Sequence, residues 1–262
     1  MRQIWTEKEI LFLKQKYPQN TATILTKILK RTKIAINCKA NSLGIKSSLI
    51  GISNKRYYFI ENFFSKPNLI NSYWAGFIAA DGCINDKRHG QKQIRIGLAD
   101  KDISILKRFK RDIEFTGEVK VRKNSVNLDI TSNKLCLDLK NNFNITPRKS
   151  LTLKPPKNLT KNCEAAFIIG MIDGDGYIRS YRKNKLRLSL VGTYEELFFV
   201  HRFLLKLNKN LIFNQLPIYK KDNVYIYELY STKAEILLRY LYKLNIQKLN
   251  RKWDVVKKVI NG

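Results

Sequence analysis

The sequence contains few of the residues from which metal clusters and disulfide frameworks are built. Among its 262 residues are four cysteines and two histidines, and no two cysteines form a CxxC pair. A structural zinc site is therefore not expected. Scattered, unpaired cysteines are typical of a reducing compartment. We expect an intracellular protein.

Long hydrophobic runs are also missing. Runs such as AAFIIGMI, at 165–172, fall far short of the ~20 apolar residues of a membrane span, and no basic-then-apolar leader opens the chain. We expect a soluble protein without a membrane partner. The abundance of Lys, Asn and Ile indicates an AT-rich genome, and it leaves the cytoplasm of a phage-infected bacterium and an organelle matrix both open as the compartment.

Acidic residues are scarce, since 21 Asp and Glu stand against 50 Lys and Arg and leave a net charge of +29. A polyanion is the expected partner. The basic residues are interleaved with Ile, Leu, Phe and Tyr throughout, so the charge belongs to folded surface and not to a basic tail. At 44% hydrophobic residues, the chain can bury one large core or two to three small ones.

One apolar segment that ends in Asp-Gly occurs twice, as YWAGFIAADGCI at 73–84 and as FIIGMIDGDGYI at 167–178. An offset of 94 residues matches Gly76 with Gly170 and Asp81 with Asp175. A basic strand pair, a helical run, a second strand pair and a closing helix follow each copy. We predict an α+β protein with two pseudo-symmetric αββαββα repeats.

The duplication gives the two carboxylates a chemical meaning. Small residues along both segments allow the two helices to pack closely. A carboxylate in the last turn faces the negative end of the helix dipole, and two of them across a pseudo-twofold axis also repel each other. A cation is expected there, and hard oxygen ligands suit Mg²⁺.

Both segments, WAGFIAADG at 74–82 and IIGMIDGDG at 168–176, resemble the nine-residue signature of the LAGLIDADG homing endonucleases, in the single-chain form with two motifs. The resemblance covers roughly residues 70 to 262. It implies that the two helices form the interface between the halves and that two four-stranded sheets form a basic saddle on the DNA major groove. It further implies a site-specific, metal-dependent double-strand break with short 3′ overhangs in a long recognition site. Such a break promotes mobility of the enzyme's own gene or of a host intron or intein.

The same resemblance assigns residues to the metal site. Asp81 and Asp175 correspond to the metal ligands, and the backbone carbonyls of Ala80 and Gly174 are expected to assist. Mn²⁺ is expected to substitute for Mg²⁺, and Ca²⁺ to bind without supporting cleavage. The sequence departs from the signature at Ala79 and at Gly174. Because both final acids remain, we expect both DNA strands to be cut.

A lysine late in each half is a further feature that the resemblance implies, close to the scissile phosphates. Lys149 follows the first half, and Lys252 stands at the matching point of the second, with Lys248 as an alternative. No Ser/His/Asp or Cys/His set competes for the role of catalyst. Two or three metal ions held by two carboxylates supply what phosphodiester hydrolysis needs, namely an activated water and a stabilised leaving oxygen.

The strands should provide the DNA contacts, because alternation separates an apolar face from a polar one. Ile94 and Ile96, for example, oppose Arg95. Arginine reads guanine bidentately in the major groove. The predicted contacts are Arg95, Lys120 and Arg122 in the first half, and Arg179, Tyr181, Arg187, Ser189 and Lys220 in the second.

Residues 1–46 are predicted to form a separate helix-turn-helix module. Thr6 and Glu9 have the spacing of a capping box, and a third helix can begin at Thr32 and stop at Gly44. RTKIAINCKANSLGI resembles the Myb-like or homeodomain-like class, which we expect to lengthen the DNA site. A small helical cap on the nuclease is the alternative. The candidate DNA contacts are Lys33, Asn37, Lys39 and Asn41.

The predicted organisation is thus a DNA-binding module at 1–46, a linker at 47–70 and repeats at 71–154 and 155–262, in a monomer with internal pseudo-twofold symmetry. Double-stranded DNA is the expected partner. Two other functions stay open on the same fold: an intron-RNA maturase, and a DNA-binding regulator without cleavage activity. The presence of both motif carboxylates favours the endonuclease.

Overall fold

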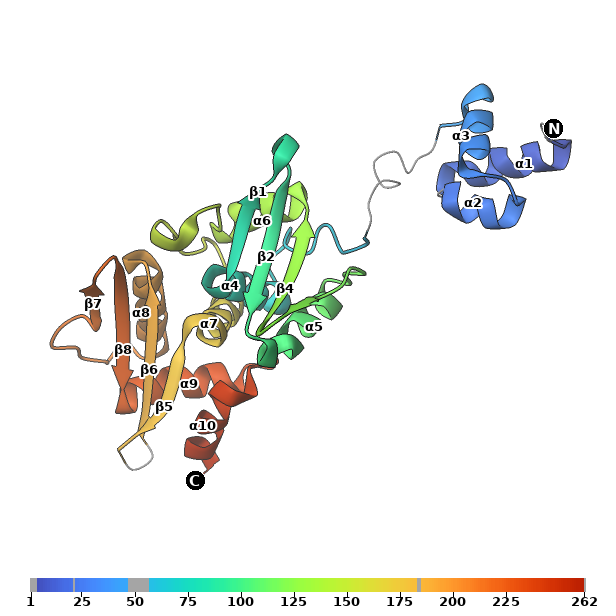
Figure 1. Ribbon diagram of the computed structural model, residues 1–262. Coiled ribbons are helices and arrows are strands. Elements are labelled where there is room, and N and C mark those ends of the chain that lie inside the picture. Colours follow the sequence, from blue (N-terminus) through green and yellow to red (C-terminus); the bar gives the residue numbers. More distant parts are fainter. Residues whose placement is uncertain (1–3, 21, 47–56, 183–184, 262) are drawn as a thin grey trace. The chain divides into compact units, whose positions relative to one another are not determined.

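The computed structural model describes residues 4–20, 22–46, 57–182 and 185–261, without the side chains at 19, 27, 89, 181 and 261. The chain divides into two compact units, Met1–Tyr58 and Phe59–Gly262. Part of the predicted linker thereby belongs to the second unit, because Phe59 and Phe64 are buried in its core. Each unit is described by itself (Figure 1).

The described part of the first unit contains three helices, α1 (Glu7–Lys16), α2 (Ala22–Leu29) and α3 (Lys33–Ser42), with a 3-10 turn at Tyr17–Gln19. The capping box of Thr6 and Glu9 forms as predicted, and the Thr32 side chain accepts a hydrogen bond from the Ala35 N–H. Four fully buried side chains form the small core of this unit: Leu13, Leu25, Ile36 and Ala40.

The second unit contains the predicted repeat twice. Its first half runs α4 (Leu69–Asp81), β1 (Gly82–Asp86), β2 (Lys92–Leu98), α5 (Ile103–Asp112), β3 (Lys120–Arg122), β4 (Ser125–Thr131) and α6 (Asn133–Phe143). Its second half runs α7 (Lys161–Asp175), β5 (Tyr177–Tyr181), β6 (Lys185–Gly192), α8 (Tyr194–Leu207), β7 (Ile218–Lys221), β8 (Val224–Tyr230) and α9 (Ser231–Lys243). A helix α10 (Asn250–Asn261) follows. The sheets have the equivalent orders β1-β2-β4-β3 and β5-β6-β8-β7, with antiparallel neighbours.

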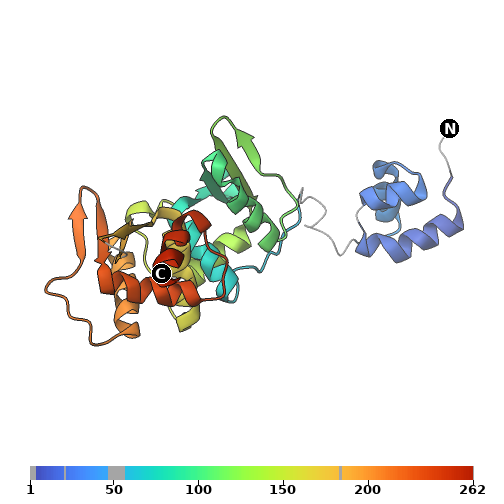
Figure 2. The same ribbon diagram turned by 90° about the horizontal axis from the view of Figure 1, so that it is seen from below.

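Helices α4 and α7 pack directly on each other between the two sheets (Figure 1, Figure 2). A Cβ added at Gly76 would lie 1.9 Å from the carbonyl oxygen of Phe167, and one added at Gly170 would lie 2.0 Å from that of Tyr73. These two contacts are equivalent under the offset of 94 residues. Glycine is therefore required at both points, because the backbones touch where any side chain would begin.

Each sheet turns one face toward the helices and leaves the other free. Ile94 and Ile96 of β2 are buried, as are Leu186 and Leu188 of β6. Their neighbours along the strands point the other way, to a surface that we call the open face. Among the described residues, no helix is long and apolar enough to cross a membrane.

Candidate active site

The two motif carboxylates end the two packed helices. Asp81 is the last residue of α4 and Asp175 the last of α7, and each precedes a glycine at the start of its strand region. Gly174 brings the two helix ends together, since a Cβ added there would lie 2.4 Å from the Ala80 Cβ and 3.4 Å from Asp81 Oδ2. The sequence places these carboxylates correctly because they follow the glycines that set the helix contact.

The electrostatics at the helix ends disfavour two free negative charges. Burial, and then the negative charge of Asp175, raise the pKa of Asp81 to about 6, against a lowering effect of Lys252. Partial burial also raises the pKa of Asp175, although Lys149 and Lys252 oppose the shift. A bound cation would remove this repulsion, because an opposite charge at short range favours the ionised form of both acids.

Two lysines bind the carbonyl groups at the helix ends. Lys149 is buried, and its Nζ donates to the carbonyl of Ala79 at 2.5 Å and to that of Ala80 at 3.4 Å. Lys252 Nζ donates to the carbonyls of Ile172 at 2.9 Å and Gly174 at 2.5 Å. Each lysine therefore satisfies the end of the motif helix in its own half. Burial lowers the pKa of both lysines, and the nearby carboxylates partly reverse the shift.

Lys248, the alternative to Lys252, lies elsewhere. Its Nζ donates to the carbonyls of Leu244, at 2.6 Å, and Ile246, at 3.1 Å. Burial lowers its pKa to about 8, and the carboxylate that partly offsets this is Asp173, not either motif-terminal acid. The structure thus places Lys252, and not Lys248, at the end of α7.

The donor atoms at this point fit a hard divalent cation. Two carboxylates and the carbonyls of Ala80 and Gly174 converge on the helix ends, and oxygen donors suit Mg²⁺. The carbonyls are shared with the lysines, which a carbonyl oxygen with two lone pairs permits. Within the described residues, no group of three or more His, Cys, Asp or Glu residues could form a separate metal site.

Asp173, the other acid of the second motif, has a structural role. It is 1% exposed and accepts hydrogen bonds from Tyr73 Oη (2.8 Å), Trp253 Nε1 (2.6 Å) and the Leu249 N–H (2.9 Å). It therefore ties α7 to α4 and to the segment that begins α10. Sequence reasoning missed this role, because the three donors lie 76 to 100 residues away along the chain.

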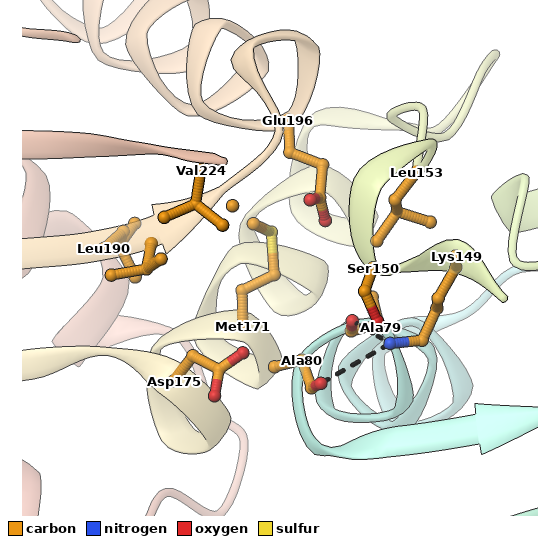
Figure 3. A pocket seen from close by; sticks show the side chains of 12 residues that line it. Ala79, Ala80, Lys149, Ser150, Leu153, Met171, Asp175, Leu190, Glu196 and Val224 are labelled. Carbon is orange, nitrogen blue, oxygen red and sulfur yellow. Dashed lines mark hydrogen bonds between the residues drawn. The ribbon is translucent and has the colours of Figure 1, made fainter. Parts of the chain in front are cut away.

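A cavity of about 160 Å³ lies beside Asp175 (Figure 3). Lys149 and Glu196 line it together with Asp175. Glu196 is 5% exposed, and burial raises its pKa to about 7, against the lowering effects of the Thr193 hydrogen bonds and of Lys149. Glu196 also forms the capping box of α8 with Thr193, and the sequence analysis did not single it out.

The equivalent hollow beside Asp81 has different walls. It is lined by Asp102, at the position equivalent to Glu196 under the offset, and by Arg251, whose Nη2 lies 3.1 Å from Asp102 Oδ2. The cavity beside Asp175 therefore contains a buried acid and a lysine, whereas the cavity beside Asp81 is lined by a more exposed arginine–aspartate pair. The two halves are similar in fold but not in chemistry.

The predicted DNA-contacting residues of the first sheet all reach the open face. Lys120 and Arg122 pair with Asn127 and Ser125, whose intervening neighbour Val126 is buried. Val121 lies on the opposite side to these two basic residues but is 65% exposed, because β3 is a short edge strand. Arg95 is opposite Asp129 on β4, an acid that the sequence analysis did not single out.

In the second sheet, one predicted contact lies on the wrong side. Arg179, Arg187 and Ser189 share the open face. Lys220 instead pairs with Tyr225, which lies on the same side of β8 as buried Tyr227, so Lys220 shares the helix-covered side. Its assignment to the open face was wrong, because the register and not the charge decides the side. Tyr181 pairs with Lys185, but its side chain lies outside the described residues.

The candidate contacts of the first unit lie on α3. Lys33 and Asn41 are exposed, and Lys39 is half-buried. Asn37 accepts a hydrogen bond from Tyr17 Oη at 3.2 Å, so it has a structural partner within the unit. Lys33 and Asn41 are therefore the most accessible of the four.

Comparison with known proteins finds solved structures with a similar fold. No family model matches the sequence, and no curated protein matches it either. The meganuclease I-SmaMI bound to uncleavable DNA has a similar structure, with a TM-score of 0.50 and 14% identity over 74% of this chain and 89% of that chain. An I-SmaMI variant gives a TM-score of 0.50 at 13% identity, over 74% and 91% of the two chains. The LAGLIDADG meganuclease I-AabMI bound to uncleaved DNA gives a TM-score of 0.47 at 16% identity, over 74% and 89%.

Proposed function

We propose that this protein, whose second unit has the LAGLIDADG homing-endonuclease fold, is a site-specific endonuclease that cuts both strands of DNA. The observation that carries the proposal is the convergence of Asp81 and Asp175 at the ends of two helices whose backbones touch. Structures with this fold include one bound to DNA. A net charge of +29 suits a nucleic-acid ligand. The finer proposal is a break with short 3′ overhangs in a long site that promotes mobility of the gene or of a host intron or intein.

Each part of the site has a role in this proposal. Asp81 and Asp175 hold Mg²⁺, with the carbonyls of Ala80 and Gly174 as additional oxygen donors. When bound, the cation supplies charge stabilisation for the phosphate and an attacking water of lowered pKa. Lys149 and Lys252 stand at the same helix ends, where their positive charge stabilises the negative charge that develops on the phosphate. The open faces bind the duplex in a monomer.

One experiment, which compares several metal ions, distinguishes an endonuclease from the alternative functions. The substrate is a duplex that joins the two sequences flanking the gene, without the gene, because a mobile gene interrupts its own target. Full-length protein is incubated with Mg²⁺, Mn²⁺, Ca²⁺ or EDTA, and both binding and strand breakage are measured. Double-strand breaks in Mg²⁺ and Mn²⁺, with binding alone in Ca²⁺, are the expected result.

Other outcomes identify the alternatives. Tight binding without cleavage in any metal would indicate a DNA-binding regulator. Specific binding to intron RNA, without binding to this duplex, would indicate a maturase. The first unit is proposed to be a helix-turn-helix module that lengthens the site, with α3 as its DNA-contacting helix. An unchanged affinity and footprint after deletion of residues 1–46 would contradict that role.

A further inference from the structure

Each open face contains one acid among its basic side chains. In the first sheet this is Asp129 on β4, and in the second it is Glu228 on β8. The register shows that their positions are equivalent, because Leu98 pairs with Val126 and its counterpart Gly192 pairs with Tyr225. A carboxylate on a surface that binds phosphates is repelled by them. Its occurrence in both copies of the repeat therefore requires an explanation.

Both acids accept hydrogen bonds from an arginine. Arg95 donates from Nε to Asp129 Oδ1 at 2.7 Å and from Nη2 to Asp129 Oδ2 at 3.2 Å, and Lys120 Nζ donates to Asp129 Oδ2 at 3.0 Å. Arg187 Nη2 donates to Glu228, and its guanidinium lies over the ring of Tyr230 at 5.0 Å. Burial raises the pKa of both acids, but the hydrogen bonds and positive charges of their partners together outweigh it and lower the pKa, so both are ionised at neutral pH.

The exposure of the pairs shows which group faces outward. The Asp129 side chain is 7% exposed, whereas that of Arg95 is 43% exposed. In the second sheet the values are 15% for Glu228 and 22% for Arg187. In both pairs the acid is the less exposed side chain, by a wide margin for Asp129 and by a small one for Glu228. The Nε edge of Arg95 is occupied by Asp129, and its Nη1 end keeps N–H donors for another acceptor.

We propose that Asp129 and Glu228 are positioning residues that hold Arg95 and Arg187 for bidentate contact with guanine in the DNA major groove. The inference rests on the proposed DNA-binding function. Guanine O6 and N7 are the base-edge acceptors that match a guanidinium fork. An arginine fixed in advance loses less side-chain freedom on binding than a free one. An ordinary cross-strand ion pair would explain the contacts but not the recurrence, in both copies, of an acid that is less exposed than the arginine it binds.

The two arginines do not lie at equivalent positions. Ser189 is the counterpart of Arg95 under the offset of 94 residues, and Gln93 is the counterpart of Arg187. Gln93 is 9% exposed and donates to Thr131 at 3.3 Å, so it has a different role. Arg187 therefore lies two residues further than Arg95 from the end of its strand that borders the motif carboxylate. At ~3.3 Å per residue, this displacement is roughly 7 Å, or about two base pairs.

The structure thus predicts an asymmetric target. One half-site should contain a preferred guanine on account of Arg95. The other should contain one about two base pairs further from the cleavage centre, on account of Arg187.

The test is selection of bound duplexes from a pool with a randomised segment, with full-length protein in Ca²⁺, followed by sequencing. The wild type should enrich guanine at the two positions. Asp129→Asn should reduce guanine enrichment at the nearer position roughly tenfold, and Glu228→Gln should do so at the further one. Both changes remove a negative charge, so affinity for non-specific DNA should rise while discrimination falls, which a purely structural role would not produce.

Two further variants keep the result interpretable. Glu164→Gln removes an acid paired with Lys206, on α7 and α8 away from the open face, at 2.8 Å, and it should leave both preferences unchanged. Arg95→Lys keeps the charge but loses the fork, and it should broaden the same position as Asp129→Asn even if the latter folds poorly. Unaltered preferences in the variants, or guanines equidistant from the centre, would overturn the inference while the DNA-binding proposal stands. Failure of the wild type to enrich any sequence would overturn both.

Discussion

Replacement of Gly170 by alanine tests the helix contact that positions the site. The added Cβ would lie 2.0 Å from the carbonyl oxygen of Tyr73 and 2.6 Å from the Phe77 nitrogen. Both atoms are backbone, so relief requires the two helices to separate. Overpacking of this kind costs about 1–3 kcal/mol, and more where backbone must shift.

The sign of the effect makes the test decisive. In a helix free of contacts, the same substitution would stabilise the protein by ~1 kcal/mol, because alanine is the better helix former. We expect instead a net loss of about 2 kcal/mol or more, or a fall in Tm of roughly 4–8 °C for a unit of this size. Thermal unfolding followed by circular dichroism measures the change. A Tm equal to or above that of the wild type would refute the proposed backbone contact.

A second position provides an internal control. Gly174→Ala places its methyl group 2.4 Å from the Ala80 Cβ, which is a side-chain atom. Ala80→Gly removes that atom. The double variant exchanges the two residues across the pseudo-twofold axis, so it should recover most of the stability that Gly174→Ala loses, and additive losses would contradict the geometry.

Two further predictions concern buried acids. The pKa of Glu196 is about 7 in the folded protein against 4.5 ordinarily, so the folded state binds this proton more tightly and stability falls as pH rises from 4.5 through 7. Glu196→Gln should therefore raise the free energy of unfolding by up to ~3 kcal/mol at pH 8 but leave it unchanged below pH 4.5. Urea unfolding of the variant and the wild type at several pH values measures the difference, and a difference that does not change with pH would contradict the prediction. Asp173→Ala leaves the donors of Tyr73, Trp253 and Leu249 unpaired and should cost about 3 kcal/mol or more, whereas a loss below ~1 kcal/mol in the same assay would show that they find other partners.

Those features that depend on spacing along the chain could be predicted from the sequence. The offset between the two motifs identified the helix pair and both terminal carboxylates, because a duplication relates positions independently of tertiary structure. Alternation in β2 correctly assigned Ile94 and Arg95 to opposite faces. The expected fold is confirmed for the same reason, since each element carries its own periodicity.

Features that depend on pairing between distant segments could not be predicted. The side on which Lys220 lies follows from the register of β7 with β8, which a four-residue strand does not reveal. The role of Asp173 depends on donors from α4 and from the segment that begins α10. The acids that bind Arg95 and Arg187 are neighbours across strands, and alternation indicates a face without indicating the partner.

The most direct test of the central claim is cleavage of the joined flanking duplex in Mg²⁺ by the wild type, Asp81→Asn and Asp175→Asn, with binding measured in parallel in Ca²⁺. Asparagine keeps the size of the side chain but removes the negative charge that holds the cation. Double-strand cleavage should be lost in both variants while sequence-specific binding persists. Undiminished double-strand cleavage by either variant would contradict the assignment of these two carboxylates as the nuclease site.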